Sequence, residues 1–248
     1  MINQTARKFD KTAVFHNAKT DPHNALIFIH GGAWIDKTNT PQDFKELCQT
    51  IIDDKTIRQD FSLYAIEYRL SPEVKHPIHL LDVLENIYQL LQQEQIDSYQ
   101  ILGHSVGATL AWQVATCNKE LDGLIDREKV DVIRSKLTKC YLVDGIYSLK
   151  ELLEEYPSYD YFVSQAFTNV DQFKDPQASY IDLAPHVSIH IVHSYKDELL
   201  SLRQPNYLIS ILQKAQLPCK VYIDDLGEHN QVYSHAKLSS YLINTFWN

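Results

Sequence analysis

The stretch GHSVG (residues 103–107) places a serine between two glycines, in the pattern G-x-S-x-G. A short apolar run, residues 99–102, predicts a strand before it, and the apolar residues 106–117 predict a helix after it. A serine on a sharp turn between a strand and a helix is the arrangement of a nucleophile elbow. The turn strains the serine backbone, the glycines leave room for neighbouring main chain, and the helix N-terminus faces a developing oxyanion. We therefore expect Ser105 to be a nucleophile rather than a helix-capping serine in a glycine-rich turn.

A second glycine-rich motif directly follows the apolar run 26–30, which predicts a buried strand. It consists of His30, Gly31, Gly32, Ala33 and Trp34. Adjacent glycines let successive N–H groups face one point, as an oxyanion hole requires, and the motif precedes the elbow as HGGG-type oxyanion loops do. By position, the expected donors are the backbone N–H groups of Gly32, Ala33 and Val106. We expect His30 to brace this loop rather than to act as a base.

The acid and the base of such a site follow the serine in the order acid, then histidine, each after a later strand. Asp197 follows the run VSIHIVH (187–193) through a short turn, and His229 follows the run KVYID (220–224). On chain order, Asp197 is the expected acid and His229 the expected base.

Other side chains compete for these two roles. Glu198 adjoins Asp197, Asp144 ends an earlier strand, and two further aspartates, Asp224 and Asp225, lie close to the strand of the base. His193 lies at the end of a strand, and His235 is expected in the final helix. Histidines in such places are more often packed or exposed than catalytic.

Along the chain, short apolar runs alternate with longer helical patterns, which is typical of a parallel sheet covered by helices. Strands are expected over residues 26–30, 63–68, 99–102, 140–143, 187–193 and 220–223, and helices over 78–91, 106–117, 205–215 and 232–247. In the final helix, Val232, Ala236, Tyr241 and Phe246 are expected on the buried side. We predict an α/β protein with one domain over residues 1–248, a mainly parallel central sheet and helices on both faces.

Residues 145–185 lie outside this alternation. The stretch is rich in tyrosine and phenylalanine. A long segment of this kind inside a compact domain is often a lid or cap over a site. A peripheral helical insertion is the equally weighted alternative.

Composition excludes several classes of protein. Apolar residues make up 44% and charged residues 22%, as in soluble globular proteins. A net charge of −9 without a basic patch argues against a nucleic-acid partner, and no apolar run is long enough to span a membrane. The first ten residues lack the apolar stretch of a signal peptide, so we expect the cytoplasm. The cysteines have no metal-ligand spacing, and we expect Cys117, Cys140 and Cys219 to be buried reduced thiols.

Five motifs together resemble the HGGxW branch of α/β-hydrolases, near the hormone-sensitive-lipase-like esterases. They are HGGAW (30–34), EYRLSP (67–72), GHSVG (103–107), SYKDELL (194–200) and LGEHN (226–230). The stretch DGIYSLKELLEEYPSYD (144–160) is more specific and resembles the fungal kynurenine formamidases, or arylformamidases. This resemblance implies an α/β-hydrolase fold and cofactor-free hydrolysis of N-formyl-L-kynurenine to formate and L-kynurenine, in tryptophan catabolism towards NAD synthesis.

Carried over by motif, the resemblance puts Ser105, Asp197 and His229 at the triad positions and residues 30–34 at the oxyanion motif. Ala33 stands where a third glycine is common in esterases, but only its backbone N–H is needed there. A formyl group is the smallest acyl group, so Trp34 together with the 145–185 segment is expected to close the acyl side. The imidazolium of His229 would give the arylamine leaving group its proton.

Two other functions compete with this interpretation. A general short-chain carboxylesterase would use the same triad without preferring formylated arylamines, and a binding protein on a hydrolase scaffold would not need a complete triad. A metal-dependent hydrolase is disfavoured because no HExxH motif is present. The expected partner is a small-molecule substrate, and a homodimer is compatible with the sequence.

Overall fold

Seven strands form one sheet in the computed structural model, which describes residues 12–19, 23–57, 60–117, 121 and 123–246. The strands are β1 (Thr12–His16), β2 (Asn24–Ile29), β3 (Ser62–Ile66), β4 (Ser98–His104), β5 (Leu137–Val143), β6 (Ser188–Ser194) and β7 (Cys219–Asp224). Their order is β1-β3-β2-β4-β5-β6-β7. Only β1 is antiparallel, to β3, while all other described neighbours pair in parallel. The predicted mainly parallel sheet is confirmed.

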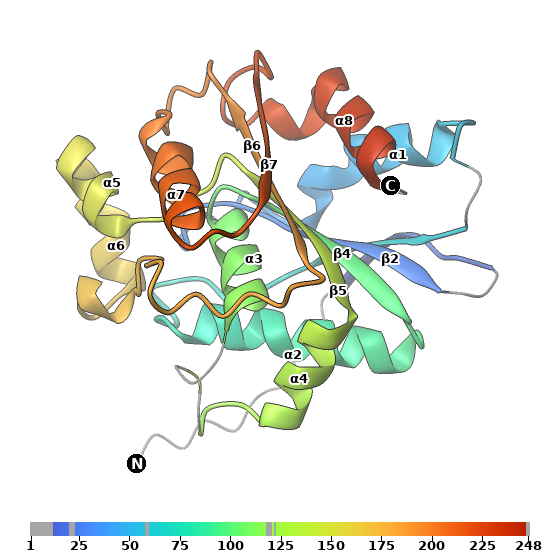
Figure 1. Ribbon diagram of the computed structural model, residues 1–248, viewed down its shortest axis with the longest axis horizontal. Coiled ribbons are helices and arrows are strands. Elements are labelled where there is room, and N and C mark those ends of the chain that lie inside the picture. The colour runs from blue at the N-terminus through green and yellow to red at the C-terminus, as the bar shows by residue number, and fades with distance from the viewer. Residues whose placement is uncertain (1–11, 20–22, 58–59, 118–120, 122, 247–248) are drawn as a thin grey trace.

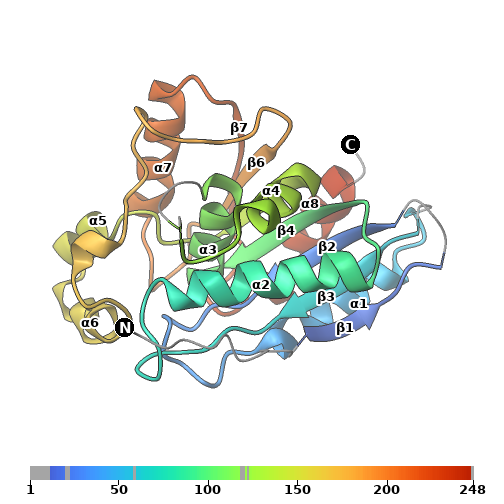
Figure 2. The same cartoon turned by 90° about the horizontal axis from the view of Figure 1, so that it is seen from below.

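Helices cover both faces of this sheet (Figures 1 and 2). They are η1 (Pro41–Phe44), α1 (Lys45–Asp53), α2 (Ile78–Gln93), α3 (Val106–Thr116), α4 (Arg127–Lys136), α5 (Leu149–Glu155), η3 (Pro157–Tyr159), α6 (Asp160–Ala166), η4 (Val170–Gln172), α7 (Arg203–Lys214), η5 (Val232–Ser234) and α8 (Ala236–Phe246). Helices α2, α3 and α7 contribute to one hydrophobic core, and α1 and α8 contribute to the other. None of the described helices has the length and apolar character needed to cross a membrane.

The central strands are mostly apolar because helices bury both of their faces. In β2, residues 25–29 (ALIFI) are all at most 1% exposed. Strand β4 pairs with β2 on one side and with β5 on the other, and its last pair joins His104 to Val143. The residue that follows, Ser105, is thus held at the carboxyl edge in the middle of the sheet.

The structure adds elements that the apolar pattern does not predict, namely β1, α1 and α4. The prediction of one continuous helix over residues 232–247 is wrong, because the segment breaks at His235, between η5 and α8. After this break the buried residues of α8 are Leu238, Ser239, Leu242 and Phe246. Ala236 is therefore exposed and Tyr241 half-buried, contrary to expectation, whereas Val232 and Phe246 are buried as predicted. Trp247 and the first ten residues lie outside the described residues.

The four cysteines are free thiols. Cys48, Cys117 and Cys140 are buried, as expected for the last two. Cys219 is only partly buried, because it begins the edge strand β7, which pairs on one side only.

The 145–185 segment folds as short helices, α5, η3, α6 and η4. In Figure 1 the helices α5 and α6 stand beyond the sheet, at the edge where β4 and β5 end. This is the edge at which open parallel α/β sheets bind their ligands.

Candidate active site

Ser105 sits on the tight turn between β4 and α3. Its backbone has φ 55° and ψ −123°, a strained conformation for a residue with a side chain. Its N–H donates to Val143 O of the neighbouring strand at 2.9 Å, which fixes the turn against β5. The side chain is consequently held at the N-terminus of α3, where unpaired N–H groups and the helix dipole favour negative charge.

The two glycines of the motif are required by close backbone packing. A Cβ atom on Gly103 would lie 2.0 Å from Gly107 O, so no side chain fits inside the turn. A Cβ atom on Gly107 would lie 2.1 Å from Ile29 O, because α3 begins directly against the end of β2. Strand β2 is the one that leads into the oxyanion motif, so this contact brings the two motifs together.

The HGGAW loop lies beside the nucleophile. A Cβ atom on Gly31 would lie 3.0 Å from the Cβ of Ser105. Gly32, Ala33 and Trp34 have φ values of 101°, 49° and 60°, so the loop turns through the left-handed region at three successive residues. The N–H groups of Gly32 and Ala33 have no backbone acceptor among the described residues. As the first residue of α3, Val106 has no acceptor for its N–H within the helix. The three predicted donors thus lack a backbone acceptor in the described part of the chain, and Gly31, which precedes Gly32, lies against Ser105.

A small polar network holds the start of this loop. The Tyr68 hydroxyl lies 3.0 Å from His30 O and 2.9 Å from Gly31 O. The buried His30 ring stacks on Tyr68 and places its Nε2 2.7 Å from Glu67 Oε1. His30 therefore occupies the position of a brace and not that of a base, as the sequence suggests. Tyr68 was missed, although it lies in the EYRLSP stretch.

Asp197 and His229, far apart in sequence, are brought together by the loops that follow β6 and β7. Asp197 Oδ2 lies 2.7 Å from His229 Nδ1, and the Asp197 carboxylate is fully buried. Its other oxygen, Oδ1, accepts the N–H groups of Leu199 and Leu200, each at 2.8 Å. The carboxylate is thus fixed by its own loop, with one oxygen directed at the imidazole.

The competing carboxyl groups occupy other positions. Glu198 Oε2 accepts the backbone N–H of His229 at 2.8 Å and so does not bind its ring in this structure. Asp144 is buried, and its Oδ1 accepts the N–H of Ser194 at 2.8 Å. Burial, and secondly the charge of Asp197, raise the pKa of Asp144 well above its ordinary value. Burial therefore disfavours the charged form of Asp144, whereas the hydrogen bond of 2.7 Å to the His229 ring comes from the Asp197 carboxylate.

His104, the residue before the nucleophile, reaches the loop of the predicted base. Its Nε2 lies 2.9 Å from His229 O, and the two rings have centroids 4.7 Å apart. Burial, and secondly the neighbouring His229, lower the pKa of His104 well below its usual value. Ser105 Oγ forms no hydrogen bond within the described residues. The hydrogen bond between Asp197 and the His229 ring is formed in this structure, whereas one between His229 and Ser105 is not.

The other candidate histidines have structural partners. His193 Nε2 lies 3.0 Å from Leu200 O, and its Nδ1 lies 3.2 Å from Asp144 Oδ1. His235 lies between η5 and α8, not inside the helix. Two sets of side chains, His104–Asp144–His229 and Asp144–His193–Asp197, bring nitrogen and oxygen atoms within 4.8 Å of one another. In the first set, His104 Nε2 bonds His229 O, Asp144 Oδ1 accepts the N–H of Ser194 and His229 Nδ1 bonds Asp197. In the second set, Asp197 binds the His229 ring and two N–H groups, so we assign both sets to the hydrogen-bond network rather than to a metal.

Trp34 joins the oxyanion loop to the 145–185 segment. Its side chain is 1% exposed, and its ring contacts Phe162 at 6.1 Å and Phe167 at 5.1 Å between centroids. On the other side of the segment, the Tyr159 hydroxyl donates to Leu199 O beside the acid. The segment therefore packs against both loops of the site. Since Trp34 is buried, it can support the acyl side of the site but offers almost no free surface.

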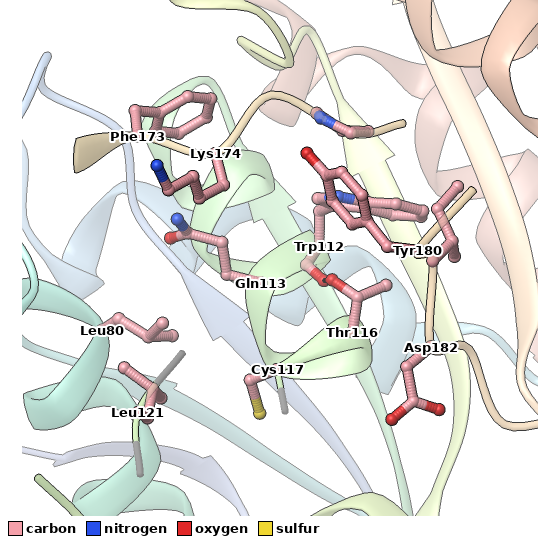
Figure 3. Close-up of a pocket in the computed structure, with 12 residues that line it drawn as sticks. Leu80, Trp112, Gln113, Thr116, Cys117, Leu121, Phe173, Lys174, Tyr180 and Asp182 are labelled. Atoms are coloured by element: carbon pink, nitrogen blue, oxygen red, sulfur yellow. Dashed lines mark hydrogen bonds between the residues drawn. The ribbon is translucent and has the colours of Figure 1, made fainter. Parts of the chain in front are cut away.

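A separate cavity lies at the far end of α3 (Figure 3). Its lining includes Trp112, Gln113 and Thr116 of α3 together with Phe173 and Tyr180 of the 145–185 segment. An eleven-residue helix is about 16 Å long, and Ser105 precedes its opposite end. This cavity is therefore not the space in which Ser105 would act.

Comparison with known proteins finds similar sequences and a similar fold. The BD-FAE family matches residues 14–212. A kynurenine formamidase of Eremothecium gossypii is 45% identical over 96% of this chain and 98% of its own length. One from Saccharomyces cerevisiae is 42% identical over 94% of this chain and 93% of its own. Among solved structures, Thermogutta terrifontis esterase 2 superposes with a TM-score of 0.68 at 17% identity, covering 94% of this chain and 88% of that protein.

Proposed function

Since this chain belongs to the kynurenine formamidases of the α/β-hydrolase superfamily, we propose that it hydrolyses N-formyl-L-kynurenine to formate and L-kynurenine through Ser105. The observation that carries the assignment of the residues is the buried hydrogen bond of 2.7 Å between Asp197 and the ring of His229, on loops beside the nucleophile. Similarity over nearly the whole chain supports the substrate.

In the first half of the reaction, Ser105 Oγ attacks the formyl carbon, and His229 Nε2 accepts the hydroxyl proton. Asp197 keeps the other ring proton on Nδ1 and stabilises the imidazolium that forms. The N–H groups of Gly32, Ala33 and Val106 bind the oxyanion of the tetrahedral intermediate. The imidazolium then gives its proton to the arylamine nitrogen, the C–N bond breaks, and L-kynurenine leaves a formyl ester on Ser105.

In the second half, a water molecule takes the place of the amine. His229 removes a proton from it, the hydroxide attacks the formyl ester, and the proton returns to Ser105 as formate leaves. No cofactor is needed at any step, because each proton is carried by His229 and each negative charge by the backbone donors.

The acyl side of the site is closed, in this proposal, by the contact of Trp34 with the 145–185 segment. Phe162 and Phe167 hold the Trp34 ring from that segment and so fix the oxyanion loop. A fixed loop leaves room for a formyl hydrogen, whereas each added methylene would have to displace packed atoms at a cost of about 1–3 kcal/mol. The four free thiols further support the cytoplasm as the compartment, because disulfides are rare there.

Covalent trapping tests the assignment of the nucleophile. A phosphonate ester that reacts with activated serines is expected to modify Ser105 alone and to abolish hydrolysis in proportion to the modification. Ser105→Ala should remove the label and lower kcat by several orders of magnitude, while the fold is retained. Labelling of another residue, or a Ser105→Ala variant that hydrolyses N-formyl-L-kynurenine at a comparable rate, would exclude this mechanism.

A further inference from the structure

We propose that His104 and Glu198 are positioning residues that hold the main chain of His229 from its two sides and thereby set the place of its ring relative to Ser105. This inference rests on the proposed function, because it takes His229 as the base of that reaction. Neither side chain touches the substrate in this account. Both act through His229.

The first contact comes from the loop that also carries the acid. Glu198 Oε2 accepts the N–H of His229 at 2.8 Å, while the preceding residue, Asp197, binds the ring. The acid loop therefore contacts His229 twice, once at the main chain and once at the side chain. This loop is itself well fixed, since Asp197 Oδ1 binds the N–H groups of Leu199 and Leu200.

The second contact comes from the nucleophile elbow. His104 Nε2 lies 2.9 Å from His229 O, and a carbonyl oxygen can only accept, so Nε2 carries the proton. The His104 ring is 1% exposed and packs between the rings of His229, at 4.7 Å, and Tyr233, at 4.9 Å. Because burial lowers the pKa of His104, the ring stays neutral and keeps this one tautomer near neutral pH.

The His104 contact links the two reacting residues directly. His104 immediately precedes Ser105, so a single hydrogen bond from its side chain connects the residue next to the nucleophile with the main chain of the base. His229 lies in an irregular loop between β7 and η5, two residues after Gly227, which has a φ of 84°. A single hydrogen bond donated by the ring Nδ1–H to Asp197 would by itself let the ring swing about that bond. Two main-chain hydrogen bonds remove this freedom.

Misplacement of a reacting group by about 1 Å can lower a rate by up to about 10²-fold. The proposal therefore predicts a loss in kcat, with KM little changed, when either contact is removed. It also predicts that a substitution which keeps the hydrogen bond to the His229 main chain retains the wild-type kcat. Glu198→Gln keeps an acceptor oxygen without the charge, and His104→Gln keeps an N–H donor at a similar distance from the main chain.

The experiment compares Glu198→Ala with Glu198→Gln and His104→Leu with His104→Gln. Glu128→Ala, an exposed glutamate on α4, is the matched control for the surface substitution. For each variant, kcat and KM are measured with N-formyl-L-kynurenine, and the rate of inactivation by a small methylphosphonate ester is measured separately. Inactivation depends on the alignment of Ser105 and His229 and not on binding of the kynurenine moiety.

We expect Glu198→Ala and His104→Leu to lower both kcat and the inactivation rate by about 10- to 100-fold. Both glutamine variants and the Glu128→Ala control should remain close to wild type. Wild-type rates in Glu198→Ala would overturn the proposal, and so would an equal loss in Glu198→Gln, which would indicate that the charge matters and not the hydrogen bond. If His104→Leu does not fold, the two Glu198 variants decide the question. A wild-type protein that reacts with the phosphonate but leaves N-formyl-L-kynurenine intact would refute the proposed function alone.

Discussion

Replacing Asp197 by asparagine should stop catalysis by reversing the tautomer of His229. Asp197 Oδ1 accepts two backbone N–H groups, from Leu199 and Leu200, each at 2.8 Å. In the Asp197→Asn variant, these donors keep the amide oxygen at that position and force the NH2 group to the place of Oδ2. That place is 2.7 Å from His229 Nδ1, so a donor would face a nitrogen that must itself donate.

The histidine can resolve this conflict only by moving its proton to Nε2. It then presents N–H to Ser105 and cannot accept the hydroxyl proton. A substitution with this effect is expected to lower kcat by about 10⁴-fold, equivalent to about 5 kcal/mol in the activation barrier, while KM changes little. The buried position of the carboxylate strengthens the expectation, because no water can replace the lost acceptor.

The assay follows release of L-kynurenine from N-formyl-L-kynurenine at saturating substrate. Glu198→Gln is the matched control, since it makes the same carboxylate-to-amide change one residue away and keeps the acceptor for the His229 N–H. Activity of Asp197→Asn within tenfold of the wild type would refute the reasoning, because it would mean that another group fixes the tautomer.

Three further predictions concern stability. Gly107→Ala should lower the free energy of unfolding by about 3 kcal/mol or more, because the new Cβ would lie 2.1 Å from Ile29 O. A soluble variant that unfolds at the same urea concentration as the wild type would contradict this. Trp34→Ala should lower the free energy of unfolding by about 3–5 kcal/mol and Tm by roughly 6–20 °C, because the ring is 1% exposed. A calorimetric Tm within about 2 °C of wild type, equivalent to about 1 kcal/mol, would contradict this. Burial lowers the pKa of His79 to about 3 and that of His76 to about 4, so below about pH 6.5 the unfolded chain binds protons that the native protein does not. The free energy of unfolding should therefore fall as the pH is lowered from about 6.5 to 4, and a flat profile in urea titrations would contradict it.

The elements that carry the site could be predicted from sequence because their signals are local. Strand β2 is a continuous apolar run before two glycines, and the elbow combines a strand, a turn and a helix within twenty residues. Helix α4 could not be found in this way. Most of its ten residues are polar or charged and it buries only Val130 and Ile133, so its packing against α2 is decided by the tertiary structure.

Within the site, chain order names Asp197 as the acid, but it does not show how the neighbouring carboxyl groups are directed. Asp144, Asp197 and Glu198 all lie near His229 in space, and the difference between them is the direction of each carboxyl group. That direction depends on backbone N–H groups, at Leu199 and Leu200 for Asp197 and at Ser194 for Asp144. The roles of His104 and Glu198 were missed for the same reason, since both bind the main chain of His229, which no side-chain pattern records.

The most direct test of the central claim is a comparison of kcat/KM for formyl, acetyl and butyryl derivatives, each made on kynurenine and on a simple phenol. The account predicts that N-formyl-L-kynurenine is the best amide substrate, and that its advantage over the longer acyl chains depends on the kynurenine half as well as on the acyl half. Ser105→Ala serves as the blank for every compound. If the phenyl esters are hydrolysed best whatever their acyl chain, and N-formyl-L-kynurenine is a poor substrate, the protein is a general carboxylesterase and the account is contradicted.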